Sequence, residues 1–398
     1  MKLPCDVRDF LKRKFQNKHK EWLKAFVLGK GPLPDSDSWP LEINLGIPAE
    51  QEALLYKERV QAWISAWRSW RGRGSLVWNE RRWRTLGTQS VPCKLILECP
   101  DDVAGWIDET TRWSHAAERF RLLVQRWPAL ADNLSGYFNV LADYSDSDFL
   151  NLFGVLSWIC ANPQSNLYIR QIPVAGIDSK WLEARKNIVS DLIAMIMGDL
   201  SDDCDFFRRC GLRPQPQLIR IRILDPDLKI QFGGLCDISS PMEEIAGLCI
   251  SPKYVFIIEN IQTGLAFNDL KNCVVIMGLG YGVDVLGKIP WLHNARCIYW
   301  GDIDTHGFVI LNRARSYLPH LVSVLMDEKT LLGHRELWVM ERDQYASEEL
   351  PLLTAAELKV FQSLMHNVWG QQIRMEQERI RWDEAWQCLL EAAGVTLQ

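Results

Sequence analysis

Residues 295–307, ARCIYWGDIDTHG, decide the fold of the C-terminal part of this chain. The run from 297 to 300 is apolar without polar alternation, which is typical of a strand buried on both faces of a parallel sheet. Two aspartates, Asp302 and Asp304, follow it. Side chains two residues apart in an extended chain project to the same side. We therefore predict a buried strand that carries two carboxylates at its carboxyl end.

Three more apolar runs predict further strands, at 254–258, 273–277 and 321–326. A helical pattern at 307–317 separates the last two strands, and residues 361–393 read as a charged helical region. This alternation of strands and helices predicts an α/β domain with a parallel sheet. Ligands of such sheets bind at the carboxyl ends of the strands, so acids at those ends are candidate site residues.

Glu259 directly follows the first of these strands, and Asp327 follows the last. Several carboxylates at one edge repel each other unless a cation or protons offset their charge. Oxygen ligands in an open site suit Mg²⁺ or Mn²⁺. We therefore predict that Glu259, Asp302 and Asp304 bind such a metal ion.

A plainer interpretation exists for several of these acids. The Asp-x-Asp pattern alone is a weak metal signal. The Glu259-Asn260 pair can cap the helix that follows its strand, and Asp327 can cap the segment that follows its own. The combination of an apolar strand ending in Glu and a later one ending in Gly-Asp-x-Asp is much more specific than any single acid.

The segment 171–245 predicts a smaller unit. Helical patterns at 188–198 and 202–210 precede a period-two strand at 219–224, and 229–232 can return as a second strand after a turn. Helix, helix, hairpin is the order of a winged helix. The basic residues of this unit that we consider for DNA phosphate binding are Lys180, Arg220 and Arg222. Both arginines also fit an exposed strand face.

Residues 1–170 predict a mainly helical domain with a strand-like stretch around 75–98. Its charge is uneven, because residues 1–24 hold eight basic and three acidic side chains and residues 57–84 hold eight basic and two acidic ones. Such patches fit phosphate contact or a solvated helix face. Many of the chain's 18 tryptophans also lie here, and they fit either core packing or stacking on bases.

Composition sets wider limits. A chain of 398 residues with 47% apolar and 24% charged residues predicts a folded protein of two or three domains. The 11 cysteines form no Cys-x-x-Cys pair, which argues against structural zinc and a disulfide scaffold and favours reduced, buried thiols in the cytoplasm. We expect no signal peptide and no membrane span, because no long apolar run is present.

Several motifs together resemble a known family. They are Trp300–Gly307 (WGDIDTHG), Ile258-Glu259-Asn260, Gly278–Gly282 (GLGYG), Glu376-Gln377-Glu378-Arg379, Gly176–Glu183 (GIDSKWLE) and Gly234–Ile238 (GLCDI). The acidic pattern is similar to the Toprim fold of topoisomerases, primases and some nucleases. The residues of these motifs resemble even more the JetD subunits of Wadjet defence systems, which are relatives of the topoisomerase VI A subunit. The resemblance covers roughly 170–398.

The resemblance implies a homodimeric, metal-dependent DNA endonuclease that cuts circular plasmid DNA. It implies partners of the same system, namely an SMC-type ATPase, a kleisin and a winged-helix subunit. By residue, it carries over Glu259 as the Toprim glutamate and Asp302 and Asp304 as the metal-binding aspartates. The expected architecture is α/β plus α+β in three domains: mainly helical at 1–170, winged-helix-like at 171–245, and Toprim with a parallel sheet at 246–398.

His306 follows the acids directly and has several possible roles in such a site. It can contact the scissile phosphate or donate a proton to the leaving oxygen, which makes it a candidate catalytic residue. Alternatively, it can hydrogen-bond a carboxylate and hold it in place.

Topoisomerase relatives attack DNA with a tyrosine, often within an Arg-x-x-Tyr-Tyr run, on a winged-helix domain. Residues 171–245 contain no tyrosine, which favours hydrolysis through metal-bound water. Glu259 then acts as a metal ligand or as a general base. Two alternatives stay open: covalent chemistry by a tyrosine from elsewhere in the chain, and a catalytically inert DNA-binding adaptor.

Overall fold

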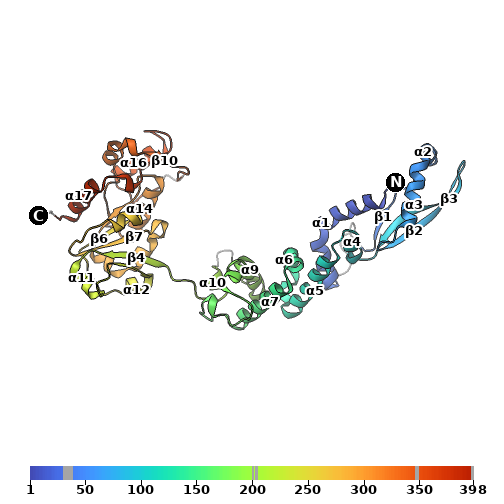
Figure 1. The fold of residues 1–398 in the computed structure, drawn as a ribbon, viewed down its shortest axis with the longest axis horizontal. Coiled ribbons are helices and arrows are strands. Elements are labelled where there is room, and N and C mark those ends of the chain that lie inside the picture. Colours follow the sequence, from blue (N-terminus) through green and yellow to red (C-terminus); the bar gives the residue numbers. More distant parts are fainter. Residues whose placement is uncertain (30–38, 200, 202–204, 346–348, 396–398) are drawn as a thin grey trace. The chain divides into compact units, whose positions relative to one another are not determined.

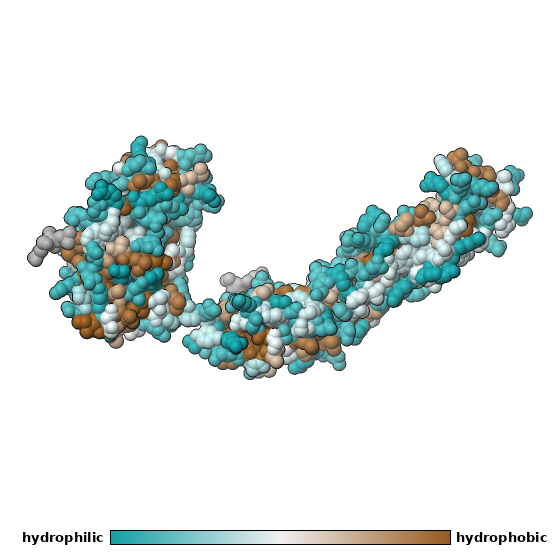
Figure 2. Space-filling model, in the orientation of Figure 1, coloured by the Kyte–Doolittle hydropathy of each residue, from teal (hydrophilic) through white to brown (hydrophobic). Residues whose placement is uncertain are grey.

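The computed structural model describes residues 1–29, 39–199, 201, 205–345 and 349–395. The chain forms two compact units, Met1–Pro214 and Gln215–Gln398, which are described separately here. Each unit has its own hydrophobic core. On the face seen in Figure 2, the surface of each unit is mostly hydrophilic with smaller apolar patches between. Among the described residues, no helix is both long and apolar enough to cross a membrane.

The N-terminal unit is mainly helical, as predicted. Its helices are α1 (Pro4–Leu28), α2 (Glu50–Leu55), α3 (Lys57–Ser69), α4 (Pro100–Trp106), α5 (Thr110–Arg126), α6 (Phe138–Asp143), α7 (Asp146–Ala161), α8 (Ser179–Glu183), α9 (Lys186–Met197) and α10 (Phe206–Arg209), with 3₁₀ helices η1 (Pro128–Asp132), η2 (Leu134–Tyr137) and η3 (Ile169–Gln171). Strands β1 (Leu41–Asn44), β2 (Ser75–Trp83) and β3 (Gly87–Leu97) form an antiparallel sheet in the order β1-β3-β2.

Tryptophans supply much of the core of this unit. Trp22, Trp63, Trp67 and Trp113 are fully buried, which confirms the core interpretation for these four. The indole nitrogens of Trp63 and Trp67 both donate to the carbonyl of Lys2, at 2.8 and 2.9 Å. Burial favours such a partner for the indole N–H, and these two bonds hold Lys2 against α3.

The C-terminal unit is an α/β structure built on one six-stranded sheet. Its strands are β4 (Leu218–Ile223), β5 (Asp237–Pro241), β6 (Tyr254–Ile258), β7 (Cys273–Met277), β8 (Arg296–Trp300) and β9 (Val322–Ser323), in the order β5-β4-β7-β6-β8-β9. The four strands from β7 to β9 in this order are parallel, and β4 is antiparallel to both of its neighbours. All five residues of β7 are buried, as the apolar pattern predicts.

The other elements of this unit cover the sheet and its ends. They are helices α11 (Pro226–Gln231), α12 (Met242–Ala246), α13 (Ile261–Leu265), α14 (Thr305–Tyr317), α15 (Glu328–Gly333), α16 (Ala355–Met365) and α17 (Trp382–Ala393), 3₁₀ helices η4 (Gly280–Lys288), η5 (Pro290–Asn294), η6 (Arg335–Leu337) and η7 (Gln377–Arg379), and the two-residue strands β10 (Val339–Met340) and β11 (Ile373–Arg374). Strands β10 and β11 pair with each other in a small separate sheet.

The predicted hairpin at 219–232 is wrong. Residues 226–231 form helix α11, because Pro226 suits the first helical turn and Asp225 caps it by accepting a hydrogen bond from the Leu228 amide at 2.7 Å. Strand β4 instead joins the large sheet between β5 and β7, and Figure 1 labels it beside β7. The contacts divide the chain at Pro214 and Gln215, within the segment that we predicted to be one winged-helix-like unit.

The predicted helical region at 361–393 is also only partly correct. Helices α16 and α17 flank a stretch that contains β11 and η7. Asn367 and Gln372 have positive φ angles of 54° and 49°, which end the helical path after α16. The intervening stretch then crosses the acidic end of the sheet. The ten cysteines that the structure describes are free thiols. Cys210, Cys273 and Cys297 are buried, five others are partly buried, and Cys5 and Cys249 are exposed.

Candidate acidic site at the strand ends

The site lies where the order of the parallel strands reverses. In the order β7-β6-β8-β9, β6 comes first in the sequence. The chain runs from β6 to β7 on one side of β6 and then from β7 to β8 on the other side. Open α/β sheets bind ligands at the carboxyl side of this switch point. Glu259 follows β6, Asp302 and Asp304 follow β8, and the Glu259 amide donates to the Trp300 carbonyl at 3.2 Å. The structure thus brings the three predicted acids together.

Burial and mutual repulsion act on these carboxylates. Burial, followed by the charges of Asp302 and Asp304, raises the pKa of Glu259 to about 7. Burial, Glu341 and Asp302 raise the pKa of Asp304 to about 6 against a hydrogen bond from Gly307. Raised carboxyl pKa values indicate negative charge that the surroundings do not fully offset.

Two glycines allow the close packing of the site. A Cβ atom on Gly301 would lie 2.6 Å from Oε2 of Glu259, and one on Gly307 would lie 2.2 Å from the carbonyl oxygen of Asp302. Real Cβ atoms do not approach other atoms so closely. Gly307 therefore requires glycine, because its neighbour is backbone, and a larger residue at position 301 would displace the Glu259 carboxylate. Both belong to the Gly-Asp-x-Asp-x-x-Gly stretch from which the site was predicted.

Asp304 also has the structural role that a cap provides. Its Oδ1 accepts a hydrogen bond from the Gly307 amide at 2.7 Å, and Asp304 is the N-cap of α14. The positive end of this 13-residue helix therefore faces the acidic site and favours anions there. Asn260, and not Glu259, caps α13 by accepting from the Thr263 amide at 3.0 Å, so the capping interpretation holds for Asn260 alone.

A C-terminal stretch, which we call the 373–379 segment, crosses the ends of β6 and β8. An antiparallel bridge between Ile303 and Met375 fixes it, with backbone hydrogen bonds of 2.9 and 3.0 Å. Arg374 lies beside the acids: its Nη2 donates to Oδ2 of Asp302 at 2.7 Å, and its Nε lies 3.3 Å from Oδ2 of Asp304. The segment therefore supplies the acidic site with a cation.

Gln377 ties this segment to both strand ends. It is 1% exposed. Its backbone amide donates to Oδ1 of Asp302 at 2.8 Å. Its side-chain Oε1 accepts from the Asn260 backbone amide at 2.7 Å, and its side-chain Nε2 donates to the Trp300 carbonyl at 3.4 Å. The sequence marked residues 376–379 only through the family resemblance, and it did not indicate that Arg374 and Gln377 touch the site.

Glu341 is a fourth carboxylate that the sequence analysis missed. It is 3% exposed, and its Oε1 accepts from the Thr305 amide at 3.1 Å and from the Thr305 hydroxyl at 2.5 Å. Its Oε2 is buried without a hydrogen-bond partner. No local signal could have found it, because it follows a two-residue strand and comes close to Asp304 only through the tertiary fold.

His306 does not hydrogen-bond any of the three predicted acids. Its Nε2 lies 2.7 Å from the Asp343 carbonyl oxygen, and its Nδ1 contacts the Tyr281 hydroxyl. A carbonyl oxygen only accepts, so Nε2 carries the proton and Nδ1 accepts from Tyr281. Tyr281 is 44% exposed and comes from the Gly-Leu-Gly-Tyr-Gly stretch after β7. The pKa of Tyr281 is raised by burial and by the nearby Asp304.

The basic residues predicted to bind phosphate belong to different units of the chain. Lys180 is exposed on α8 in the N-terminal unit. In the C-terminal unit, Arg220 donates to both oxygens of Asp237 at 2.8 and 2.6 Å, and Arg222 donates to the Phe267 carbonyl at 3.1 Å. Both arginines thus already have partners, and their contact with DNA stays a prediction.

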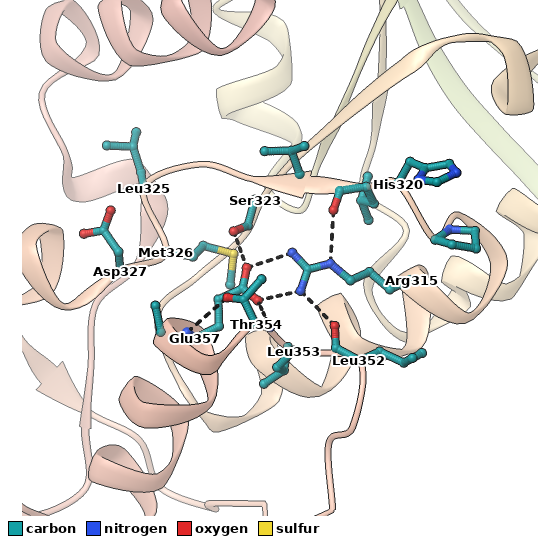
Figure 3. Close-up of a pocket in the computed structure, with 14 residues that line it drawn as sticks. Arg315, His320, Ser323, Leu325, Met326, Asp327, Leu352, Leu353, Thr354 and Glu357 are labelled. Atoms are coloured by element: carbon teal, nitrogen blue, oxygen red, sulfur yellow. Dashed lines mark hydrogen bonds and ion pairs between the residues drawn. The ribbon is translucent and has the colours of Figure 1, made fainter.

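Figure 3 shows a cavity in the C-terminal unit, which is lined by none of the residues of the acidic site. Arg315 donates to both oxygens of Glu357, which also accepts from Ser323, and these bonds join α14 to α16. Asp327 lies at this cavity and caps α15, accepting from the Thr330 amide at 2.7 Å. The capping interpretation of Asp327 is therefore confirmed.

The acids provide oxygen donors of the kind that a hard divalent cation needs, and their charge exceeds that of Arg374. The unpartnered oxygen of Glu341 adds to that excess. Within the described ranges, however, no three His, Cys, Asp or Glu side chains are arranged as a complete metal-binding group. The donor chemistry therefore fits Mg²⁺ or Mn²⁺, while the aspartates are turned towards Arg374.

Comparison with known proteins covers both parts of the chain. Residues 211–389 match the family described as Wadjet protein JetD, C-terminal, and residues 4–194 match the family described as uncharacterized protein conserved in bacteria, N-term. No curated protein matches the chain. The C-terminal match includes Glu259, Asp302, Asp304 and the 373–379 segment. The chain therefore belongs to the JetD family of Wadjet proteins.

Proposed function

We propose that this chain is the metal-dependent DNA endonuclease of a Wadjet complex and cleaves circular plasmid DNA by hydrolysis. Membership of the JetD family implies a role in Wadjet anti-plasmid defence. The observation that carries the nuclease proposal is the convergence of Glu259, Asp302 and Asp304 at the switch point of the sheet. A DNA phosphodiester is an anionic substrate, and a metal ion is what lets an acidic site accept it.

Glu259, Asp302 and Asp304 would hold the Mg²⁺ or Mn²⁺ ion. Such an ion supplies Lewis-acid stabilisation of the phosphoryl oxygens and lowers the pKa of bound water. The chain's own groups do the rest. The amino end of α14 faces the site and favours the phosphate, and the Gln377 amide fixes Asp302.

Glu259 has the properties of a general base. With a pKa of about 7, it is partly ionised at neutral pH and can accept a proton from the attacking water. If Glu259 is a metal ligand instead, the metal ion lowers the pKa of Glu259, and the carboxyl group no longer titrates near pH 7. The pH dependence of cleavage, measured under single-turnover conditions, separates the two roles: a rise in rate centred near neutrality that Glu259→Gln removes indicates the base.

The partners belong to the proposal as well. As a member of the multi-subunit Wadjet system, the chain has partners from that system, and we propose an SMC-type ATPase, a kleisin and a winged-helix subunit among them. We further propose that it acts as a homodimer on double-stranded DNA. A dimer would present two acidic sites, one for each strand of the duplex.

A second candidate function is covalent cleavage by a tyrosine, and Tyr281 is the residue that favours it. Its hydroxyl contacts His306 Nδ1, and His306 is oriented by the Asp343 carbonyl, so a nucleophile, a base and an orienting group lie in sequence. The raised pKa of Tyr281 disfavours the phenolate that attack requires. We therefore rank hydrolysis first.

The test is to incubate the purified protein with supercoiled plasmid and Mn²⁺ or Mg²⁺, with and without the other subunits. Hydrolysis predicts nicked or linear DNA with free ends. DNA ends linked to protein that disappear in Tyr281→Phe would support the covalent alternative. DNA binding without cleavage, with all subunits and metal present, would support an inert adaptor and overturn both enzyme proposals.

A further inference from the structure

We propose that Arg374 is the resident counter-cation of the acidic site, and that a divalent metal ion binds by displacing it from Asp302 and Asp304. The inference rests on the proposed function, because it assumes that these acids bind a metal ion. It adds a residue that the acidic motif does not contain. Among the residues that the structure describes, Arg374 is the cation that forms ion pairs with these aspartates.

The two oxygens of each aspartate have different partners. Each aspartate uses Oδ1 for a backbone amide: Asp302 accepts from Gln377 at 2.8 Å and Asp304 accepts from Gly307 at 2.7 Å. Each turns Oδ2 towards the guanidinium of Arg374, at 2.7 and 3.3 Å. The two oxygens that carry no backbone hydrogen bond are therefore the two that face Arg374, and they are the oxygens most open to a metal ion once the arginine moves.

The carboxylates around Arg374 outnumber its single positive charge. One guanidinium carries a single positive charge, and Glu259, Asp302, Asp304 and Glu341 surround the same region. A divalent ion carries twice the charge and approaches carboxylate oxygens to about 2.0–2.2 Å, closer than any nitrogen donor. Coulomb attraction therefore favours the metal ion over Arg374, provided that the arginine can leave.

The Arg374 side chain can move away from Asp302 and Asp304. Its side chain is 31% exposed. Its Nε is buried, yet the contact with Asp304 lacks hydrogen-bond geometry, so this nitrogen has no hydrogen-bond partner. Glu376 offers another carboxylate, with Oε1 at 3.6 Å from Nη2. A rotation of the Arg374 side chain towards Glu376 would free both aspartates while the Ile303–Met375 bridge keeps the backbone in place.

Calorimetric titration of the full-length, metal-stripped protein with Mn²⁺ tests this exchange. Arg374→Gln removes the competitor, and we expect it to bind Mn²⁺ about tenfold more tightly than the wild type, a change of one decade in Kd. Arg374→Lys keeps the charge but lacks the planar fork that spans two carboxylates, so we expect an increase in affinity of roughly threefold. It serves as the second variant if Arg374→Gln does not fold.

Arg379→Gln is the matched control. It removes the same charge from the same segment, but Arg379 pairs with Glu376 and not with the aspartates. We expect its Mn²⁺ affinity to stay within about twofold of the wild type. In the absence of metal, Arg374→Gln should also lower the Tm, and saturating Mn²⁺ should narrow that difference, because the metal-bound wild type has already given up the arginine contacts.

Equal or weaker Mn²⁺ binding by both Arg374 variants, with a wild type that binds, would overturn this inference and leave the proposed nuclease intact. If Arg379→Gln binds Mn²⁺ as tightly as Arg374→Gln does, the inference is also overturned. The gain in affinity would then come from removing any positive charge near the site. No Mn²⁺ binding by any of the proteins would overturn both this inference and the metal dependence in the proposed function.

Discussion

Glu259 is the residue whose titration most directly reports the electrostatics of the site. Its pKa of about 7 lies above the ordinary value of 4.5, so the folded, metal-free protein binds a proton that the unfolded chain releases. A raised carboxyl pKa means that the contribution of Glu259 to stability is fully present below pH 4.5 and is lost as the pH rises through about 7.

We therefore predict that, in chelator, the C-terminal unit of Glu259→Gln loses less stability than the wild type between about pH 4.5 and pH 7, the window set by the two pKa values. The difference should reach roughly 3 kcal/mol, since one pKa unit corresponds to about 1.4 kcal/mol. Chemical denaturation across that range measures it. If the free energy of unfolding changes with pH in the same way for both proteins, the pKa of Glu259 in the folded protein is not raised above its ordinary value of 4.5.

The buried residue Gln377 hydrogen-bonds the ends of strands β6 and β8 and the candidate metal ligand Asp302. We predict that Gln377→Ala destabilises the C-terminal unit by about 2–4 kcal/mol, because it leaves a cavity and removes partners of the Asn260 amide and the Trp300 carbonyl. Denaturation with urea measures the loss. Gln387→Ala is a suitable control, since that amide lies on an exposed face and bonds only Glu391 among the contacts described. Equal effects of the two changes would contradict the role given to Gln377.

At the level of elements, the strands with apolar runs were predictable, and the pairing of β10 with β11 was not. Strands β6, β7 and β8 are continuous apolar runs whose carboxyl ends carry the acids, so sequence alone located Glu259, Asp302 and Asp304. Strands β10 and β11 have two residues each and exist because they pair with each other. Glu341 and Arg374 reach the site through that pairing, and no local pattern indicates it.

The β2–β3 hairpin is the element of the N-terminal unit for which we predict contact with DNA. Only the last residues of β3, from 94 to 97, pair with β1, so the rest is a two-stranded ribbon. Arg81 and Arg82 are exposed on it, and the residues described include no ion-pair partner for either. A basic ribbon of this kind fits the phosphate backbone of a duplex.

We predict that Arg81→Gln/Arg82→Gln weakens binding of duplex DNA and lowers the slope of log K against log salt by about 2, because each lost phosphate contact removes roughly 0.9. Fluorescence anisotropy at several salt concentrations measures the slope. Arg121→Gln/Lys329→Gln removes two exposed charges elsewhere and is the control. If the control lowers the slope as much as the hairpin variant, the hairpin has no special role.

For the whole molecule, the cores explain why the predicted domain boundaries fail to match the contacts. One core uses residues up to Leu212 and the other begins at Ile219. The connecting residues 213–218 are all exposed and include Pro214 and Pro216. The sequence analysis grouped β4 with the preceding helices by their order along the chain, whereas its hydrogen bonds run to β5 and β7.

Two separate cores predict independent folding of the units. Limited proteolysis should cut first near residues 213–218 and leave two fragments that each unfold cooperatively. Mass spectrometry of the fragments and calorimetry of the purified C-terminal fragment are the measurements. First cuts inside either core, or a C-terminal fragment without an unfolding transition, would contradict the division at Pro214 and Gln215.

The central claim is that Glu259, Asp302 and Asp304 form a metal site that cuts DNA. The most direct test is cleavage of circular plasmid by the complete Wadjet complex in Mn²⁺ or Mg²⁺, comparing wild type with Asp302→Asn, which keeps the size of the side chain and removes its charge. We predict that Asp302→Asn binds DNA and its partners normally and loses cleavage by at least about a hundredfold, a loss typical of a removed catalytic metal ligand. Undiminished cleavage by that variant would contradict the account.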